Sequence, residues 1–155
     1  MVSIYRKLGW RSWVITLLLL AVTACNGLVA PPGTPTPIPT LAFGSPVSLP
    51  YGKYTDIAVA DLKGLLAHKN FVLINVSSPP DGQIEGTDLQ IPYDQIDQNL
   101  AKLPRDKATM IVVYCRNGRP CGIASAALVK LGYTQVLNLV GGLDAWQKAG
   151  YPIVK

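Results

Sequence analysis

Three apolar runs of strand length, alternating with helical patterns, constrain the fold of this chain most strongly. They are FVLINV (residues 71–76), TMIVVY (residues 109–114) and QVLNLV (residues 135–140). Continuous apolar runs of this length are typical of strands buried on both faces, as in a parallel sheet. Because helical patterns separate the runs, right-handed crossovers are expected. The sequence therefore predicts an α/β fold with a parallel-stranded central sheet flanked by helices.

Shorter patterns complete the predicted domain. Two further strands are predicted at YTDIAV (54–59) and DLQIP (88–92), and helices at ADLKGLLAHK (60–69), YDQIDQNLAKL (93–103), CGIASAALVKLG (121–132) and GLDAWQKAG (142–150). Pro104 is expected to end the second of these helices. A chain of 155 residues favours one domain with additional segments, and we assign the domain to residues 51–155.

The first 24 residues have the composition of a secretory signal. Arg6, Lys7 and Arg11 precede the apolar run VITLLLLAVTA, which ends at Ala24. A positive segment, a short apolar run and small residues before a break are typical of a signal peptide. The run is shorter than the roughly 20 apolar residues that a membrane span requires. Residues 1–24 are therefore predicted to be removed.

The end of this segment, VTAC, resembles the lipobox of bacterial lipoproteins. An aliphatic residue and two small residues precede Cys25. The resemblance implies that Cys25 is lipidated through a thioether and becomes the first residue of the mature protein. We then expect a lipid-anchored protein at the cell membrane, facing the extracytoplasmic side. An ordinary signal peptide, with a cysteine at this place by chance, is the alternative.

Residues 25–50 are predicted to be a linker between the lipid and the domain. Seven of the thirteen prolines of the chain lie between Pro31 and Pro50, mixed with threonine and glycine and without any charged residue. Proline fixes φ and removes a hydrogen-bond donor, so this segment is expected to be an extended spacer rather than a helix or an interior strand.

The charge of the chain does not favour nucleic-acid binding. The formal net charge is +5, but three of the fourteen basic residues lie in residues 1–24, which contain none of the nine acidic residues. The remainder is almost balanced and has no basic cluster beyond one loop. We expect no nucleic-acid partner.

That loop is YCRNGRPCG (residues 114–122), between a predicted buried strand and a predicted helix. Ligands of parallel α/β sheets collect beyond the carboxyl ends of the strands. The loop contains Cys115 and Cys121, and two of the three arginines that follow Cys25 in the chain. It is therefore the first candidate for a functional site.

Several chemistries are possible for two cysteines with this spacing. A zinc site needs about four ligands, whereas the domain offers Cys115, Cys121 and His68, which is expected at the surface; we predict no metal. Thioredoxin-type pairs have two intervening residues rather than five. Cysteine phosphatases have an arginine six residues after the nucleophile, where this chain has Cys121. A structural disulfide stays possible, although so small a ring gains little unfolded-state entropy.

A nucleophilic thiolate at Cys115 explains more features of the loop than a structural disulfide does. Backbone amides of residues 116–121 can converge on a sulfur at the end of a strand, and Gly118 supplies the conformational freedom that such a nest requires. The N-terminus of the following helix and the two arginines add positive charge. All of these lower the pKa of a thiol and stabilise the thiolate.

The segment IVVYCRNGRPCGIASAALVKLGYTQVLNLVGGLDAWQKAGYPI resembles the C-terminal half of a rhodanese-like domain, the sulfurtransferase module. FVLINVSSPPDGQIEGTDLQIP is similar, more weakly, to the upstream part of that domain. The resemblance covers about 100 residues and implies a single rhodanese-like domain. The matching positions are Cys115, Gly118, Gly132, Gly141, Gly142, Trp146, Gly150, Tyr151 and Pro152.

The resemblance implies a sulfurtransferase without a cofactor. Cys115 would attack the sulfane sulfur of a small anionic donor such as thiosulfate, and its persulfide would pass that sulfur to a thiol or to cyanide. The resemblance also assigns the substrate cradle to the residues that follow Cys115, namely Arg116, Asn117, Gly118, Arg119, Pro120 and Cys121. The protein partner and the oligomeric state are not indicated.

The chain departs from the family pattern at several positions. Asn75, Ser77 and Gln83 stand where the family usually has aspartate, arginine and histidine, and the loop between residues 77 and 82 is shorter. Pro120 and Cys121 stand where the family often has arginine and serine. Because Pro120 removes one amide donor, the donor pocket is expected to differ. Two further hypotheses therefore stay open: a dithiol redox protein that uses Cys115 and Cys121, and a non-catalytic binding module.

The lipidation hypothesis can be tested by substitution of Cys25. The unmodified chain should partition into the detergent phase of a detergent extraction, and Cys25→Ser should abolish this partition because serine cannot form the thioether. A Cys25→Ser variant that stays fully in the detergent phase would instead indicate an uncleaved apolar anchor.

Overall fold

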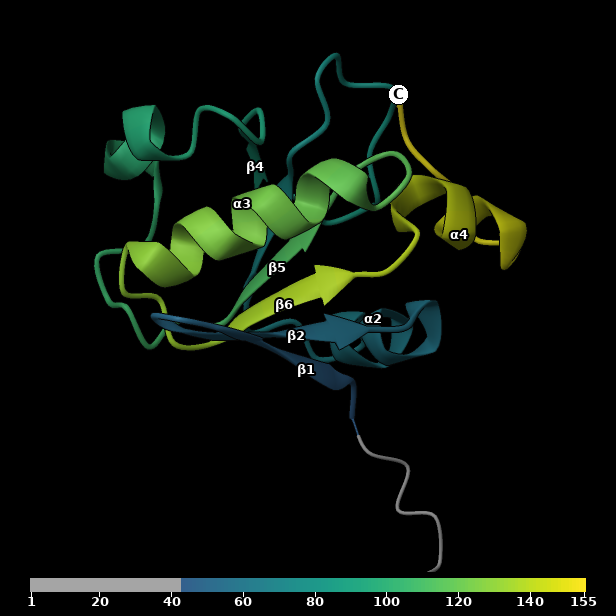
Figure 1. Cartoon of the computed structure of the whole chain (residues 1–155). Helices are drawn as coiled ribbons and strands as arrows, with labels where there is room; N and C mark the ends of the chain where they lie inside the picture. Colours follow the sequence, from purple (N-terminus) through teal and green to yellow (C-terminus); the bar gives the residue numbers. More distant parts are fainter. Residues whose placement is uncertain (1–42) are drawn as a thin grey trace, which may run out of the picture. The chain divides into compact units, whose positions relative to one another are not determined.

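A six-stranded sheet forms the centre of residues 43–155, the part of the chain that this computed structural model describes (Figure 1). The strand order is β1-β2-β6-β5-β3-β4. All neighbouring pairs are parallel except β1–β2. The elements in chain order are β1 (Ser45–Leu49), β2 (Gly52–Ile57), α2 (Val59–Leu66), β3 (Val72–Asn75), β4 (Leu89–Gln90), the 3₁₀ helix η1 (Asp97–Lys102), β5 (Ile111–Tyr114), α3 (Arg119–Lys130), β6 (Val136–Leu139) and α4 (Gly142–Lys148).

Two hydrophobic cores lie on the two faces of this sheet. Side chains of α3 form one core with Ile111 and Val113 of β5. Side chains of α2 and α4 form the other core with Val112 and Tyr114. Successive residues of a strand point to opposite faces, so a strand that is apolar throughout serves both cores. The α/β fold with a mostly parallel central sheet and flanking helices is therefore confirmed.

Strand β1 was not predicted, because its residues lie in the segment interpreted as a linker (residues 25–50). Ser45–Leu49 pairs antiparallel with β2, which makes β1 an edge strand. Proline is tolerated in edge strands, where its missing N–H group costs no ladder hydrogen bond. Pro46 therefore does not prevent pairing, and the sheet begins before residue 51.

The segment YDQIDQNLAKL also differs from the prediction. It contains the short 3₁₀ helix η1, with a non-helical residue at Asn99, instead of an amphipathic α-helix. Only Ile96 and Leu103 in this segment are well buried. Two buried residues that flank η1 do not give the continuous apolar stripe that stabilises an α-helix on a sheet.

The helix after the cysteine loop begins earlier than expected. Gly118 is the N-cap residue of α3, with a left-handed φ of 91°, and Pro120 lies in the first turn. Proline is well placed there because the first N–H groups of a helix have no partner within the helix. The helix ends as predicted near Gly132, whose φ is also 91°.

The predictions for residues 1–24 and for Cys25 lie outside the described residues. None of the helices between residues 43 and 155 is both long and apolar enough to cross a membrane. His68 is exposed, as predicted.

Candidate active site at the cysteine loop

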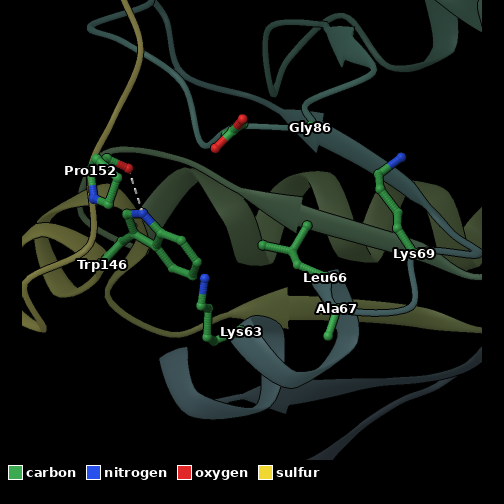
Figure 2. A pocket seen from close by; sticks show the side chains of 8 residues that line it. Lys63, Leu66, Ala67, Lys69, Gly86, Trp146 and Pro152 are labelled. Carbon is green, nitrogen blue, oxygen red and sulfur yellow. Dashed lines mark hydrogen bonds between the residues drawn. The ribbon is translucent and has the colours of Figure 1, made fainter.

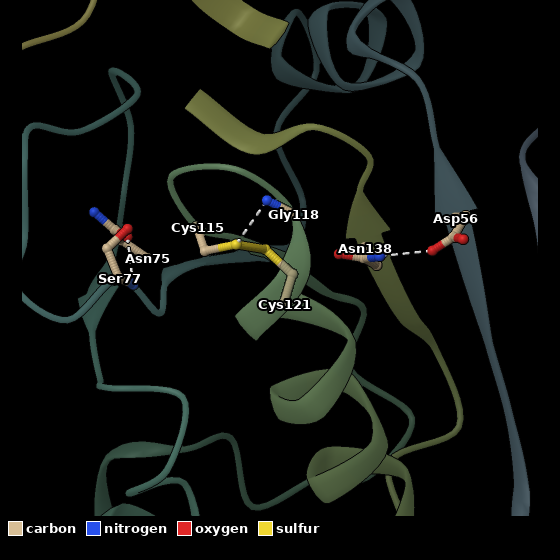
Figure 3. Close-up of a disulfide and its surroundings, with 7 residues drawn as sticks. All are labelled: Asp56, Asn75, Ser77, Cys115, Gly118, Cys121 and Asn138. Carbon is tan, nitrogen blue, oxygen red and sulfur yellow. Dashed lines mark hydrogen bonds between the residues drawn. A yellow bond between two sulfur atoms is a disulfide. The ribbon is translucent and has the colours of Figure 1, made fainter. Parts of the chain in front are cut away.

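The direction of the Cys115 side chain follows from its place after β5. Ile111 and Val113 face α3, so the same alternation directs Cys115 to this face of the sheet. Cys121 in the first turn of α3 belongs to the same core, and neither cysteine is exposed to solvent. The two sulfur atoms form a disulfide, and their Cα atoms lie 5.6 Å apart (Figure 3). The pairing that the sequence left open is present in this structure.

The backbone of the loop curls around the sulfur of Cys115. The N–H group of Gly118 donates a hydrogen bond to Sγ of Cys115 at 3.2 Å (Figure 3). The left-handed conformation of Gly118 turns this N–H inward, and a Cβ atom there would lie 3.1 Å from the nitrogen of Gly141. A hydrogen bond to sulfur favours the thiolate over the thiol. Of the backbone amides that were predicted to surround this sulfur, the Gly118 N–H donates to it directly.

The N-terminus of α4 holds the carbonyl side of the same loop. The N–H of Leu143 donates to the carbonyl oxygen of Cys115 at 2.8 Å, and the N–H of Asp144 to that of Arg116 at 3.0 Å. Gly142 makes this approach possible, because a Cβ atom there would collide with the Cys115 carbonyl oxygen. Its φ of 56° also favours glycine. The second glycine of the Gly-Gly pair is therefore required by the loop itself.

The two arginines of the loop have different surroundings. Arg116 forms ion pairs with Asp144, from Nε to Oδ1 at 2.8 Å, and with Asp81, at 3.0 Å. Within residues 43–155, no carboxylate forms an ion pair with Arg119. Arg119 is exposed at the first helical position of α3. Arg119 is therefore the loop cation that is available to an anionic ligand.

Tyr114 joins the end of β5 to the neighbouring segment. Its buried hydroxyl accepts a hydrogen bond from the N–H of Ile84 at 3.1 Å and lies 2.7 Å from Oγ1 of Thr87. Burial raises the pKa of the Tyr114 phenol. The residue before the candidate nucleophile is thus fixed as a neutral hydrogen-bonding group.

Asn75 has a structural role at the end of β3. Its side chain is fully buried and donates from Nδ2 to the carbonyl of Gly82 at 3.0 Å. Its Oδ1 accepts from the N–H of Ser77, also at 3.0 Å. Ser77 is buried as well, and its hydroxyl has no hydrogen-bond partner among the described residues. Gln83 pairs through its backbone with Val154. Asn75 thus closes the loop between residues 77 and 82 through neutral hydrogen bonds to Ser77 and Gly82, whereas Gln83 is held by its backbone to Val154.

Some of the predicted site residues contact one another, and others are exposed at the edge of the loop. Cys115 and Cys121 are joined, Gly118 contacts the sulfur, and Pro120 is half-buried in the first turn of α3. Arg116, Asn117 and Arg119 are exposed on the rim of the loop. Asp81 and Asp144, which bind Arg116, were not predicted. Both come from distant segments, and an exposed aspartate in a loop or a helix carries no local signal for such a contact.

A separate pocket of about 330 Å³ lies on the other face of the sheet (Figure 2). It is lined by residues of α2 and α4 and of the chain between β3 and β4, among them Lys63, Leu66, Glu85 and Trp146. The indole Nε1 of Trp146 donates to the carbonyl of Pro152 at 2.9 Å. Its lining includes no residue of the cysteine loop, and Cys115 faces α3 instead.

A cysteine at the end of a parallel strand, enclosed by a glycine-containing loop at a helix N-terminus, defines a class of α/β proteins with a candidate sulfur nucleophile. Residues 58–149 match the Rhodanese-like domain family, and the chain belongs to this family.

Relatives and solved structures agree with this assignment. A protein described as a sulfurtransferase from Allochromatium vinosum is 36% identical over 89 residues, which cover 56% of this chain and 80% of the relative. A rhodanese-related protein from Thermoplasma volcanium has a TM-score of 0.55 at 27% identity, over 64% of this chain and 96% of that chain. A thiosulfate sulfurtransferase from Pseudomonas aeruginosa has a TM-score of 0.56 at 24% identity, over 64% of this chain and 20% of that chain; this likeness concerns the fold alone.

The role of Asn75 predicts the cost of restoring the usual family residue. Asn75→Asp removes the amide donor to Gly82 and places a carboxylate opposite a carbonyl oxygen. We expect a loss of about 1–3 kcal/mol in the free energy of unfolding near neutral pH, because a buried acceptor is left unsatisfied. Burial raises the pKa of such a carboxyl, so the loss should shrink as the pH falls and the carboxyl binds a proton.

Urea unfolding at neutral and at mildly acidic pH measures both effects. Asn75→Ala is the matched control, since it lacks a titratable group and should show no such recovery at acidic pH. A neutral-pH stability of Asn75→Asp equal to that of the unmodified chain would contradict the assigned hydrogen bond.

Proposed function

We propose that this protein is a rhodanese-type sulfurtransferase in which Cys115 carries the transferred sulfur as a persulfide. The observation that carries the proposal is the position of Cys115. It lies at the end of β5, within a loop whose Gly118 N–H donates to its sulfur. Membership of the Rhodanese-like domain family and the similarity to a sulfurtransferase from Allochromatium vinosum support the same activity.

The first step is the attack of the reduced Cys115 thiolate on the outer sulfur of a thiosulfate-like donor. A Cys–S–S⁻ persulfide forms, the S–S bond of the donor breaks, and sulfite leaves with the electron pair. The N-terminus of α3 and the Gly118 N–H stabilise negative charge on the sulfur. Because both cysteines form the disulfide in this structure, the active species is the reduced loop.

The second step passes the sulfane sulfur to a thiophilic acceptor, such as a thiol or cyanide. The acceptor attacks the outer sulfur of the persulfide, and the Cys115 thiolate is released. The Gly118 N–H assists this step because it stabilises the leaving thiolate without reorganisation. No metal or cofactor takes part in either step of the proposal.

Arg119 is proposed to receive the anionic donor. Arg116 is neutralised by Asp81 and Asp144, whereas no carboxylate in residues 43–155 pairs with Arg119. Pro120, which follows, offers no N–H group, so the donor site depends more on the guanidinium than on amides.

We also propose that the domain works outside the cytoplasm on a lipid anchor. The VTAC motif supports lipidation at Cys25, and the uncharged proline-rich segment after it supports a spacer. Such an arrangement tethers the domain to the membrane and exposes the cysteine loop to a compartment that can be oxidising.

Substitution of the nucleophile tests the activity. Cys115→Ser should abolish sulfite release from thiosulfate, because a hydroxyl cannot form a persulfide. The swap is nearly isosteric, so its free energy of unfolding should lie within about 1 kcal/mol of that of the reduced unmodified chain. Sulfite assay and urea unfolding give the two readouts. Full turnover by a folded Cys115→Ser variant would refute the proposed nucleophile.

Substitution of the loop arginines tests the proposed donor site. Arg119→Gln should raise the KM for thiosulfate about tenfold, since one charge-assisted hydrogen bond is lost, while the fold is unchanged. Arg116→Gln is the matched control, and it should change the KM much less, because Asp81 and Asp144 already neutralise Arg116 and their exposed ion pairs add little stability. If Arg116→Gln alone raised the KM, the assignment of the two arginines would be reversed.

A further inference from the structure

We infer that Cys121 is a second catalytic residue, whose sulfur attacks the inner sulfur of the Cys115 persulfide and releases the outer sulfur as hydrosulfide. This inference rests on the proposed sulfurtransferase function and specifies how the persulfide is discharged. A thiol of the same chain displaces the transferred sulfur, and the sulfur product of a single turnover is hydrosulfide.

The arrangement of the two sulfur atoms is the main support. Cys115 and Cys121 form a disulfide whose Cα atoms lie 5.6 Å apart, within the range that a disulfide needs. The strand alternation of β5 directs Cys115 to α3, and the first turn of α3 directs Cys121 to Cys115 (Figure 3). The backbone therefore brings the two sulfurs into bonding contact. Cys115 directly follows β5, and Cys121 lies within α3.

Proximity favours the internal thiol over an external one. Both cysteines have no exposed surface in the disulfide form, whereas the residues between them are exposed or half-buried. An external acceptor, like the donor, has to reach a sulfur that the loop covers. Cys121 is already positioned next to the reacting atom, so its attack has the advantage of an intramolecular reaction.

The position of Cys121 also activates it as a nucleophile. It is the third residue of the twelve-residue helix α3, where free N–H groups and the helix dipole favour an anion. Free N–H groups at such a place stabilise a thiolate, which is the nucleophilic form of a cysteine. The disulfide is the independent observation that this sulfur does reach Cys115.

The step balances without a further reagent. The Cys121 sulfur forms a bond to Sγ of Cys115, the bond from Sγ to the outer sulfur breaks, and its electron pair leaves with the outer sulfur. The proton of the Cys121 thiol ends on the departing sulfur as HS⁻. The Cys121 sulfur is oxidised, the outer sulfur is reduced, and the product is the Cys115–Cys121 disulfide that the structure contains.

Continued turnover requires a reductant of the dithiol class. A dithiol would attack the disulfide, form a mixed disulfide and leave as its own cyclic or protein disulfide, which regenerates both thiols. Two supplies are therefore needed: a reaction that delivers the sulfur donor, and a reaction that regenerates the dithiol reductant.

A single-turnover experiment tests the inference. The full chain is reduced, freed of reductant and mixed with one equivalent of thiosulfate without any acceptor. Sulfite, hydrosulfide and the intact mass are then measured. The unmodified chain should release one equivalent each of sulfite and hydrosulfide, and its mass should fall by two hydrogen atoms relative to the reduced chain.

Variants separate this inference from the proposed function. Cys121→Ser should release one equivalent of sulfite but no hydrosulfide, and its mass should rise by one sulfur atom. Cys115→Ser should release neither product. Cys25→Ser is the matched control and should react like the unmodified chain, which excludes the third cysteine.

The outcomes are distinguishable. An unmodified chain that releases sulfite and keeps the added sulfur would overturn the role of Cys121 and leave the sulfurtransferase proposal intact. Release of hydrosulfide by Cys121→Ser, equal to that of the unmodified chain, would also overturn it. Absence of sulfite from both the unmodified chain and Cys121→Ser would instead refute the proposed function.

Discussion

The site depends on the contact between the N-terminus of α4 and the first peptides of the cysteine loop. The N–H groups of Leu143 and Asp144 donate to the carbonyls of Cys115 and Arg116. These N–H groups would otherwise lack partners at the start of a helix, and the carbonyls would lack partners beyond the end of β5. Gly142 permits the close approach. One contact thus satisfies both elements and fixes the backbone that presents the sulfur.

The same contact separates the two positive charges of the loop. Once Asp144 lies at the start of α4, its carboxylate is within reach of Arg116, and Asp81 completes the pair of partners. These exposed ion pairs add little stability individually, but they orient the Arg116 side chain toward α4 and the loop after β3. Arg119, the first residue of α3, is exposed to solvent. Both arginines carry the same charge, so only their ion-pair partners show which of them is available to a ligand.

Local sequence patterns, which involve residues close together in the chain, predicted most of the fold. The apolar runs gave β3, β5 and β6, and the alternation along β5 explains why Cys115 faces α3. The edge strand β1 was missed because a proline-rich segment resembles a spacer until a neighbouring strand is present to pair with it. The ion pairs of Arg116 and the hydrogen bonds of Asn75 were missed for a related reason. Their partners lie in other segments, and only the folded chain brings them together.

The disulfide is compatible with a bond that forms and breaks during turnover, because the fold does not depend on it. Residues 115–121 close a small ring, and a small ring removes little entropy from the unfolded chain. The core between the sheet and the helices α2 and α4, the Tyr114 hydroxyl network and the α4 contact involve neither cysteine sulfur. Reduction therefore frees two sulfurs without removing what holds the backbone around them. A buried dithiol on a fixed backbone can alternate between a thiolate that accepts sulfur and a disulfide that protects both cysteines from irreversible oxidation.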